Sequence, residues 1–277
     1  MKLPEGFVFS QSSMQDYRDC PRRFQLRYLE RRRWPAPQTS DALDLERWMQ
    51  QGYAFHRLMT RFHSGIRAPT LEVGVAADEV LQRWWDGYRQ SPPRDLPDQV
   101  VRPELALSAR LRGYRLEARF DLLTGQPGDH WVIVDWKTGR HRAPRGWWAQ
   151  RLQTHVYPFV LVRAGAALNG GRPISASQVQ MAYWFAQFPA QPEVFDYDER
   201  VYRGDEDMLG NLVLEIEGRA EEPFPKTEDR WRCRYCVYRS LCWDDVQAGL
   251  SADMPEAEAF EEWEEDIELE QVLAIPY

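Results

Sequence analysis

Three segments in the middle of the chain have the residue pattern of β-strands, and they constrain the fold more than any other feature. Residues 104–111 and 114–123 alternate apolar and polar side chains, as half-buried strands do. Residues 112–114, Arg-Gly-Tyr, form a tight link between them. A third strand is predicted at 131–137, where a β-branched Val-Ile-Val run indicates burial, and a fourth at 178–186. The first three strands are expected to pair antiparallel.

Helical periodicity surrounds these strands on both sides. Helices are predicted at residues 10–30, 42–63, 75–90, 146–163 and 201–219. Pro21 should break the first of them in two, and residues 34–41 read as a loop. This order of elements predicts an α/β or α+β fold, with a mixed central β-sheet flanked by helices.

The length and composition are ordinary for a soluble globular protein. The 277 residues suffice for one large domain or two small ones. No stretch approaches the roughly 20 apolar residues of a membrane helix, and the N-terminus lacks the apolar run of a signal peptide. We therefore expect a cytoplasmic protein without a membrane partner. Its four cysteines would then be metal ligands or reduced thiols more often than disulfides.

The net charge of −8 is unevenly distributed along the chain. Residues 251–277 hold ten acidic residues and no Lys or Arg, so the rest of the chain has a net charge of +2. This acidic tail also contains apolar residues. It is open to three interpretations: a segment that mimics DNA and covers a basic site, a docking helix for a protein partner, or a solvated, disordered end.

Six arginines fall within twelve residues near the N-terminus, from Arg22 to Arg33. Such a cluster suits contact with phosphate groups, and Arg22, Arg23 and Arg27 are candidate nucleic-acid-binding residues. An equally plain interpretation is a solvated helix face with charge pairs four residues apart.

The third predicted strand ends in charged residues. Asp135 and Lys137 are two apart and therefore lie on the same side of the strand. Asp121 ends the preceding strand, so the two carboxylates come close and repel unless a cation lies between them. Oxygen ligands favour Mg²⁺ or Mn²⁺, and Lys137 could stabilise negative charge or hold a water. The alternative is an exposed ion pair after a buried strand.

The cysteines have a spacing typical of metal sites. Cys20 stands alone, and after a gap of 212 residues follow Cys233, Cys236 and Cys242. Zinc and an iron–sulfur cluster both accept four thiolates, so the residues alone do not choose between them. Four unrelated buried thiols are the remaining possibility.

The sequence "FDLL…WVIVDWKTG" resembles the PD-(D/E)XK nuclease superfamily, in particular its RecB-like branch. The resemblance implies that Asp121, Asp135 and Lys137 are catalytic. Gln153 and Tyr157, one helical turn apart, match the Q-x-x-x-Y motif of that branch, which supports the active site and touches DNA. "GYAFH" resembles a helical G-x-x-x-H element, which implies that His56 joins Asp121 and Asp135 in the metal shell. Glu104 matches an acidic residue of the first strand more weakly.

The cysteine pattern resembles the iron–sulfur staple of two RecB-like families, the AddB nuclease subunit and the CRISPR-associated exonucleases. "SQSSMQDYRDCPRRFQLRYL" also resembles their N-terminal element. This implies one 4Fe–4S cluster on Cys20, Cys233, Cys236 and Cys242, in a helical cap that joins the two ends of the chain. The resemblance spans most of residues 7–243. The chain lacks the helicase-like portion of AddB and has Asp135 where many CRISPR-associated members have Glu.

The expected organisation has four parts. An N-terminal helical segment (1–95) carries the first cysteine, the nuclease core (96–200) follows, and then come a helix with the cysteine-rich segment (201–249) and the acidic tail (250–277).

The predicted function is that of a metal-dependent DNA exonuclease acting on single-stranded ends, in DNA repair or recombination or in CRISPR adaptation. The alternatives are a non-catalytic DNA-end-binding or partner subunit that keeps the fold, and a zinc-stapled interaction protein without a nucleic-acid role.

Overall fold

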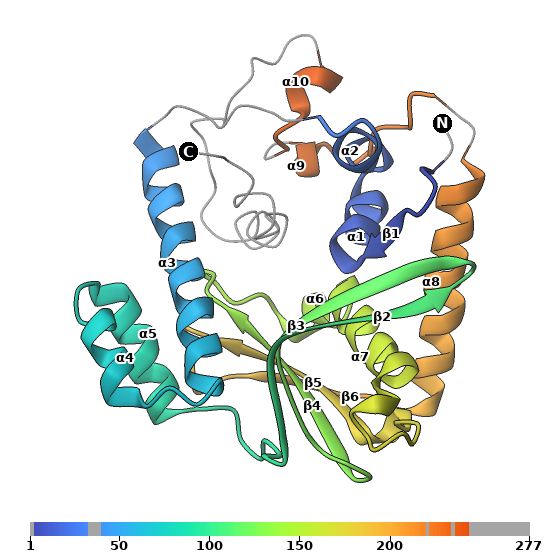
Figure 1. Ribbon diagram of the computed structural model, residues 1–277. Helices are drawn as coiled ribbons and strands as arrows, with labels where there is room; N and C mark the ends of the chain where they lie inside the picture. Colours follow the sequence, from blue (N-terminus) through green and yellow to red (C-terminus); the bar gives the residue numbers. More distant parts are fainter. Residues whose placement is uncertain (1–2, 33–39, 220–221, 234–235, 244–277) are drawn as a thin grey trace.

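The computed structural model describes residues 3–32, 40–219, 222–233 and 236–243. Its centre is a mixed sheet, with strand order β1-β3-β4-β5-β6 and β2 paired to β3 (Figure 1). The strands are β1 Val8–Ser10, β2 Val100–Leu111, β3 Tyr114–Gln126, β4 His130–Lys137, β5 Val179–Phe185 and β6 Glu193–Asp196. Pairs β1–β3 and β4–β5 are parallel, and the others are antiparallel. The predicted mixed sheet and the antiparallel β2–β3–β4 run are confirmed.

Helices cover both faces of this sheet. They are α1 Gln11–Asp19, α2 Pro21–Phe24, η1 Gln25–Leu29, α3 Ser40–His63, α4 Ala68–Val75, α5 Glu79–Gln90, α6 Arg145–Trp148, α7 Leu152–Ala164, η2 Gly165–Ala167, η3 Ala176–Gln178, α8 Glu199–Gly218, α9 Arg230–Cys233 and α10 Arg239–Cys242. Figure 1 shows α3, α4 and α5 on one side of the sheet and α7 and α8 on the other. The protein is therefore a three-layer α/β/α structure.

Alternate residues of β4 enter two separate hydrophobic cores. Trp131 and Ile133 pack with α7 and α8, whereas Val132, Val134 and Trp136 pack with α3, α4 and α5. Strands covered on both faces are apolar at nearly every position, and this explains the continuous apolar run at the start of β4. Asp135 and Lys137 fall on the α7 side because they continue the same alternation.

Several element boundaries were predicted correctly. α1 ends at Asp19, and Pro21 occupies the first turn of α2, where its missing N–H has no intrahelical partner to lose. The β2–β3 link is a two-residue hairpin in which Arg112 and Gly113 have φ values of 49° and 87°. Two successive positive φ values fit the right-handed twist of the strands. The predicted loop 34–41 falls almost entirely outside the described residues.

Two expected helices were wrong in detail, and two strands were missed. The segment 146–163 is two helices, because Arg151 has an extended backbone before α7. In the segment 75–90, Val75 is the end of α4 and the next helix begins only at Glu79, since Asp78 caps α5 by accepting from two backbone N–H groups. Strands β1 and β6 were not predicted, because three and four residues are too few to show an alternation.

The N-terminal and C-terminal segments that carry the cysteines contact each other. The N–H of Arg22 donates to the Pro225 carbonyl at 3.0 Å, and the N–H of Phe224 donates to Gln25 Oε1 at 2.8 Å. β1 also brings the first segment into the central sheet. The four-part division of the chain stays a prediction, and the acidic tail lies outside the described residues. None of the described helices has the length and apolar character needed to cross a membrane.

Candidate active site

The site begins where β3 and β4 part. The last backbone pair between them is Leu122 with Val134, so Asp121 and Asp135 come next on the two strands. There the Asp121 carboxylate takes the place of a strand partner, and its Oδ2 accepts a hydrogen bond from the Trp136 N–H at 2.8 Å. A buried N–H needs such an acceptor, so this bond fixes the carboxylate at the end of the ladder.

Glu104 lies on β2 at the position opposite Asp121. The β2–β3 ladder pairs the residues on both sides of this position but leaves out the pair itself. The backbone of Glu104 has a φ of 52°, which non-glycine residues adopt rarely and at an energetic cost. Ligand atoms of Glu104, Asp121 and His56 lie within 4.8 Å of one another. The distorted position of β2 thus adds a second carboxylate to the site.

His56 reaches the site from α3. Its Nδ1 lies 3.3 Å from Asp121 Oδ1, and the two side chains are 18% and 13% exposed. Gly52, one turn earlier, lies close to the segment after β4: a Cβ there would lie 2.8 Å from Thr138 Oγ1. The glycine of the G-x-x-x-H pattern therefore lets the helix come close enough for His56 to meet Asp121.

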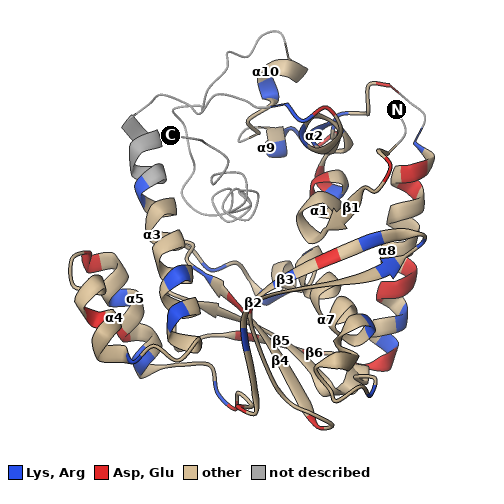
Figure 2. Cartoon of the chain, viewed as in Figure 1, with Lys and Arg blue, Asp and Glu red and all other residues tan. Residues whose placement is uncertain are grey.

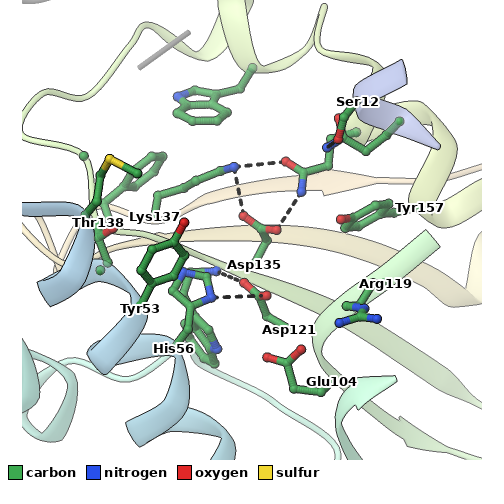
Figure 3. A pocket seen from close by; sticks show the side chains of 18 of the residues that line it. Ser12, Tyr53, His56, Glu104, Arg119, Asp121, Asp135, Lys137, Thr138 and Tyr157 are labelled. Atoms are coloured by element: carbon green, nitrogen blue, oxygen red, sulfur yellow. Dashed lines mark hydrogen bonds and ion pairs between the residues drawn. The ribbon is translucent and has the colours of Figure 1, made fainter. Parts of the chain in front are cut away.

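Lys137 is held by two groups on the other side of the site (Figure 3). Its Nζ lies 3.1 Å from Asp135 Oδ2 and donates to Gln153 Oε1 at 3.1 Å. Gln153 Nε2 in turn donates to Asp135 Oδ1 at 2.6 Å. Tyr157, the next turn of α7, packs edge-on against Phe120. The Q-x-x-x-Y pair thus lies beside the lysine, with the Gln closing a three-residue ring.

Burial and close charges shift the pKa values of the site. Burial alone would lower the pKa of His56, but the carboxylates of Asp121, Asp135 and Glu104 outweigh it and raise the pKa to about 9. Burial raises the pKa of Asp135 to about 7, although the ammonium of Lys137 acts in the opposite direction. Burial would also raise the pKa of Asp121, yet the charge of His56 and hydrogen bonds to the carboxylate hold it below its usual value. The site concentrates negative charge that a cation would offset.

These groups line one cavity of about 280 Å³. Figure 3 shows His56, Asp121 and Glu104 on one side of it and Asp135 with Lys137 on the other. Other lining residues that were not predicted as site residues are Ser12, Trp48, Tyr53, Thr138, His141 and Trp148. Tyr53 and Arg119 could have been suspected, because they lie three and two residues from His56 and Asp121. Trp48 and Trp148 do not lie so close in the sequence to a predicted catalytic or metal-binding residue.

The structure groups the predicted metal ligands differently from the sequence. His56 and Asp121 lie together, and the third ligand atom of their cluster comes from Glu104; the metal-binding roles of His56, Asp121 and Asp135 stay predictions. Asp135 instead contacts Lys137 and Gln153.

The three candidate DNA-binding arginines have acidic partners. Arg23 and Arg27 lie 2.8 and 3.0 Å from the buried Asp16, with their own side chains 12% and 7% exposed. Arg22 pairs with Glu30 at 3.0 Å. Their contact with nucleic acid stays a prediction, and ion pairs within the fold already engage all three.

The four cysteines form no disulfide with one another and are half-buried. Burial raises the pKa of the Cys233 and Cys242 thiols, and the charge of Cys20 raises both further. Burial likewise raises the pKa of Cys236 to about 12, with Cys20 and Cys242 contributing. The segments that carry these thiols contact each other, and binding of a metal or cluster by the four cysteines stays a prediction.

Comparisons with known proteins come from three directions. No curated protein sequence matches the chain. Among 23 matching chains of solved structures, the protein SSO0001 has a TM-score of 0.41 and 13% identity, with 88% of this chain and 90% of that one covered. A candidate exonuclease from Eubacterium rectale has a TM-score of 0.46 and 10% identity, with 91% and 97% covered. The family model of the PD-(D/E)XK nuclease superfamily matches residues 8–243, and the chain belongs to this superfamily.

Proposed function

We propose that this PD-(D/E)XK nuclease is a divalent-metal-dependent exonuclease that cleaves single-stranded DNA from its ends. The observation that carries the proposal is the cavity in which the ligand atoms of His56, Glu104 and Asp121 gather within 4.8 Å, with the ammonium of Lys137 across from them. Membership of the superfamily makes the reaction class phosphodiester hydrolysis with DNA as substrate.

The residues present fit Mg²⁺ or Mn²⁺. Two carboxylates supply hard oxygen ligands, and the imidazole of His56 adds a nitrogen that Mn²⁺ accepts readily. When bound, such an ion supplies Lewis-acid stabilisation of a phosphate oxygen. The raised pKa of His56 shows how strongly these carboxylates favour a positive charge at this place.

Lys137 supplies a second positive charge from the chain itself. Because Asp135 and Gln153 each contact its Nζ at 3.1 Å, the ammonium has a defined position before substrate arrives. A preorganised charge stabilises the negative charge that develops on the phosphate more effectively than a mobile one. The third donor of the ammonium can hold a water for attack on phosphorus.

The shape and lining of the cavity favour a single strand. Its volume is about 280 Å³, and the half-buried rings of Trp48 and Tyr53 line it together with the polar groups. Aromatic rings offer stacking surfaces to unpaired bases, which a duplex keeps inside its helix. We place the activity in DNA repair or recombination or in CRISPR adaptation, as the resemblance to the AddB and CRISPR-associated exonucleases implies.

Cleavage assays test the nuclease assignment. With Mn²⁺ and end-labelled single strands, Asp121→Asn and Lys137→Ala should each lose at least about 100-fold in rate, the scale for deleting one electrostatic stabiliser. Asp129→Asn, in the exposed β3–β4 turn, is the matched control and should cleave like the wild type. Circular single strands should be spared if ends are required. Full activity in both site variants would refute the assignment, and binding of DNA ends without cleavage by the wild type would favour a non-catalytic subunit.

The cysteines are proposed to hold one 4Fe–4S cluster. The placement of Cys20 before the nuclease core and of three cysteines after it, on segments that contact each other, supports this proposal. Such a cluster would link two segments separated by 212 residues, and its binding energy would contribute to folding. Protein purified without oxygen should be brown and should bleach with dithionite. If the protein is colourless and holds one zinc ion per chain, the four cysteines bind zinc and not an iron–sulfur cluster.

A further inference from the structure

Gln15 is a buried glutamine on α1 that uses both ends of its amide. Its side chain is 3% exposed. The Oε1 atom accepts a hydrogen bond from the backbone N–H of Leu152 at 3.0 Å, and the Nε2 atom donates to Asp19 Oδ1 at 3.0 Å. Gln15 therefore connects the first residue of α7 to the end of α1, two places that are more than 100 residues apart in the chain.

The bond to Leu152 matters because the start of α7 has no cap of its own. The first N–H groups of a helix lack intrahelical acceptors, and the residue before α7, Arg151, makes no side-chain capping bond. Leu152 is fully buried, so water cannot replace the missing acceptor. The next residue along is Gln153, whose amide joins Asp135 and Lys137 at the active site. The acceptor that fixes the beginning of α7 thus lies one residue from a group that holds the lysine.

The other end of Gln15 leads to the cysteine-bearing segments. Asp19 is 7% exposed and lies 3.2 Å from Arg23 and 2.7 Å from Arg232. Cys20 follows Asp19 in the sequence, and Cys233 follows Arg232. Figure 2 shows the basic residues of α2 and α9 next to α1. A series of polar contacts therefore runs from the segments with the cysteines to the backbone of Leu152, the residue before Gln153.

We infer that Gln15 is a positioning residue of the nuclease site, which acts by fixing the first turn of α7 and thereby the amide of Gln153. This inference rests on the proposed nuclease function. Asp19 holds Gln15 in place, and Arg232 couples that arrangement to the C-terminal segment. Loss of the Leu152 acceptor lets the first turn of α7 open, and Lys137 then loses one of its two fixed partners.

The variant Gln15→Met tests this role, since methionine has a similar length and no hydrogen-bonding amide. Backbone amides of residues 152–157 should exchange with deuterium roughly tenfold faster or more, as expected for loss of a buried hydrogen bond. The kcat for single-strand cleavage should fall about tenfold while KM changes little, because Lys137 acts on the transition state.

Gln25→Met is the matched control. Gln25 is also 3% exposed, and its Oε1 also accepts from a buried backbone N–H, that of Phe224 at 2.8 Å. Its loss should lower thermal stability without changing exchange at 152–157 or kcat. Equal effects of both variants on exchange and kcat would overturn the inference, because a general loss of stability would then explain them.

Swapping the amide and the carboxylate between positions 15 and 19 tests whether the hydrogen bond to Leu152 can be restored. In the double variant Gln15→Glu with Asp19→Asn, the carboxylate at 15 can accept from Leu152 and from the new amide at 19, and the total charge is unchanged. The single variant Gln15→Glu places two carboxylates together and should behave like Gln15→Met. The double variant should restore slow exchange and bring kcat to within about threefold of the wild type.

Deuterium exchange separates this inference from the proposed function. A wild type that cleaves no DNA with any divalent metal defeats the nuclease proposal, whereas exchange at 152–157 still reports whether Gln15 holds α7. Unchanged exchange in Gln15→Met defeats the positioning role, even when the wild type is an active nuclease.

Discussion

Gly52 illustrates how a single residue shapes this site. Its importance lies in space rather than in backbone freedom, since it sits inside a regular helix against Thr138. The closeness of α3 to the segment after β4 is what allows His56 to reach Asp121 at 3.3 Å. A pattern of one glycine and one histidine four residues apart thus has a packing explanation that the sequence alone does not reveal.

Gly52→Ala should weaken metal binding. A Cβ at 2.8 Å from Thr138 Oγ1 forces α3 away from the site, and we expect about tenfold lower affinity for Mn²⁺, measured by calorimetry. Adding Thr138→Ala removes the clashing oxygen and should recover most of the affinity. Gly74→Ala in α4, where a Cβ meets nothing within 4 Å, serves as the control. Unchanged Mn²⁺ affinity in Gly52→Ala would show that the close approach is dispensable.

At the scale of elements, α3 and α5 are joined to β4 by a cluster of aromatic rings. His63 at the end of α3 stacks on Trp136 with 5.8 Å between ring centroids, and its Nε2 lies 3.0 Å from the Tyr88 hydroxyl. Burial lowers the pKa of His63 to about 4, because a charged imidazole would lose its hydration among these rings. Protonation of His63 at low pH should therefore destabilise the packing of α3 and α5 against β4.

The direction of that sensitivity follows from the difference in proton binding. Between the ordinary pKa of about 6.5 and about 4, the unfolded chain binds a proton at His63 and the folded chain does not, so stability falls as pH falls. His63→Phe keeps the stacking and removes the titration. From pH 7.5 to 4.5 it should gain about 2–3 kcal/mol in unfolding free energy relative to the wild type, measured with urea. A His63→Phe variant whose unfolding free energy has the same pH dependence as that of the wild type would contradict the assignment.

Across the whole molecule, charge is divided between a body of net charge +2 and a tail with ten acidic residues. A nuclease that binds DNA phosphates must attract a polyanion, and a tail of this charge opposes that attraction or competes with it. A protein partner that docks on the tail would remove the opposition. These arguments depend only on charge and chain connectivity, since the tail lies outside the described residues.

A chain ending at Gly249 should bind single-stranded DNA more tightly than the full chain. The gain should be largest near about 50 mM salt and shrink towards about 200 mM, because phosphate contacts weaken over that range. A full-length variant with the ten acidic residues changed to Asn and Gln separates charge from length and should match the truncated chain. Fluorescence anisotropy gives the affinities. Equal binding by all three proteins at low salt would eliminate electrostatic competition and leave partner docking to be tested by pull-down.

The sequence by itself determined the types of the main elements and the sides on which their residues lie, because periodicity is a local property of the chain. The residue pattern placed Asp135 and Lys137 at the end of β4 and Asp121 on the neighbouring strand. The expectation that Asp121 ends its strand was wrong, because β3 continues past it to Gln126, paired with β4 from Leu122 onward. The helical spacing placed Gln153 and Tyr157 one turn apart, and the cysteine pattern indicated that the two ends of the chain meet.

Only the tertiary structure decided which of these groups face one another. Glu104 joins His56 because a distorted position of β2 lies opposite Asp121, and Arg27 pairs with Asp16 instead of facing solvent. The first N–H of α7 likewise donates to Gln15 of α1. Such pairings join residues far apart in the chain through burial and geometry, which no local pattern specifies.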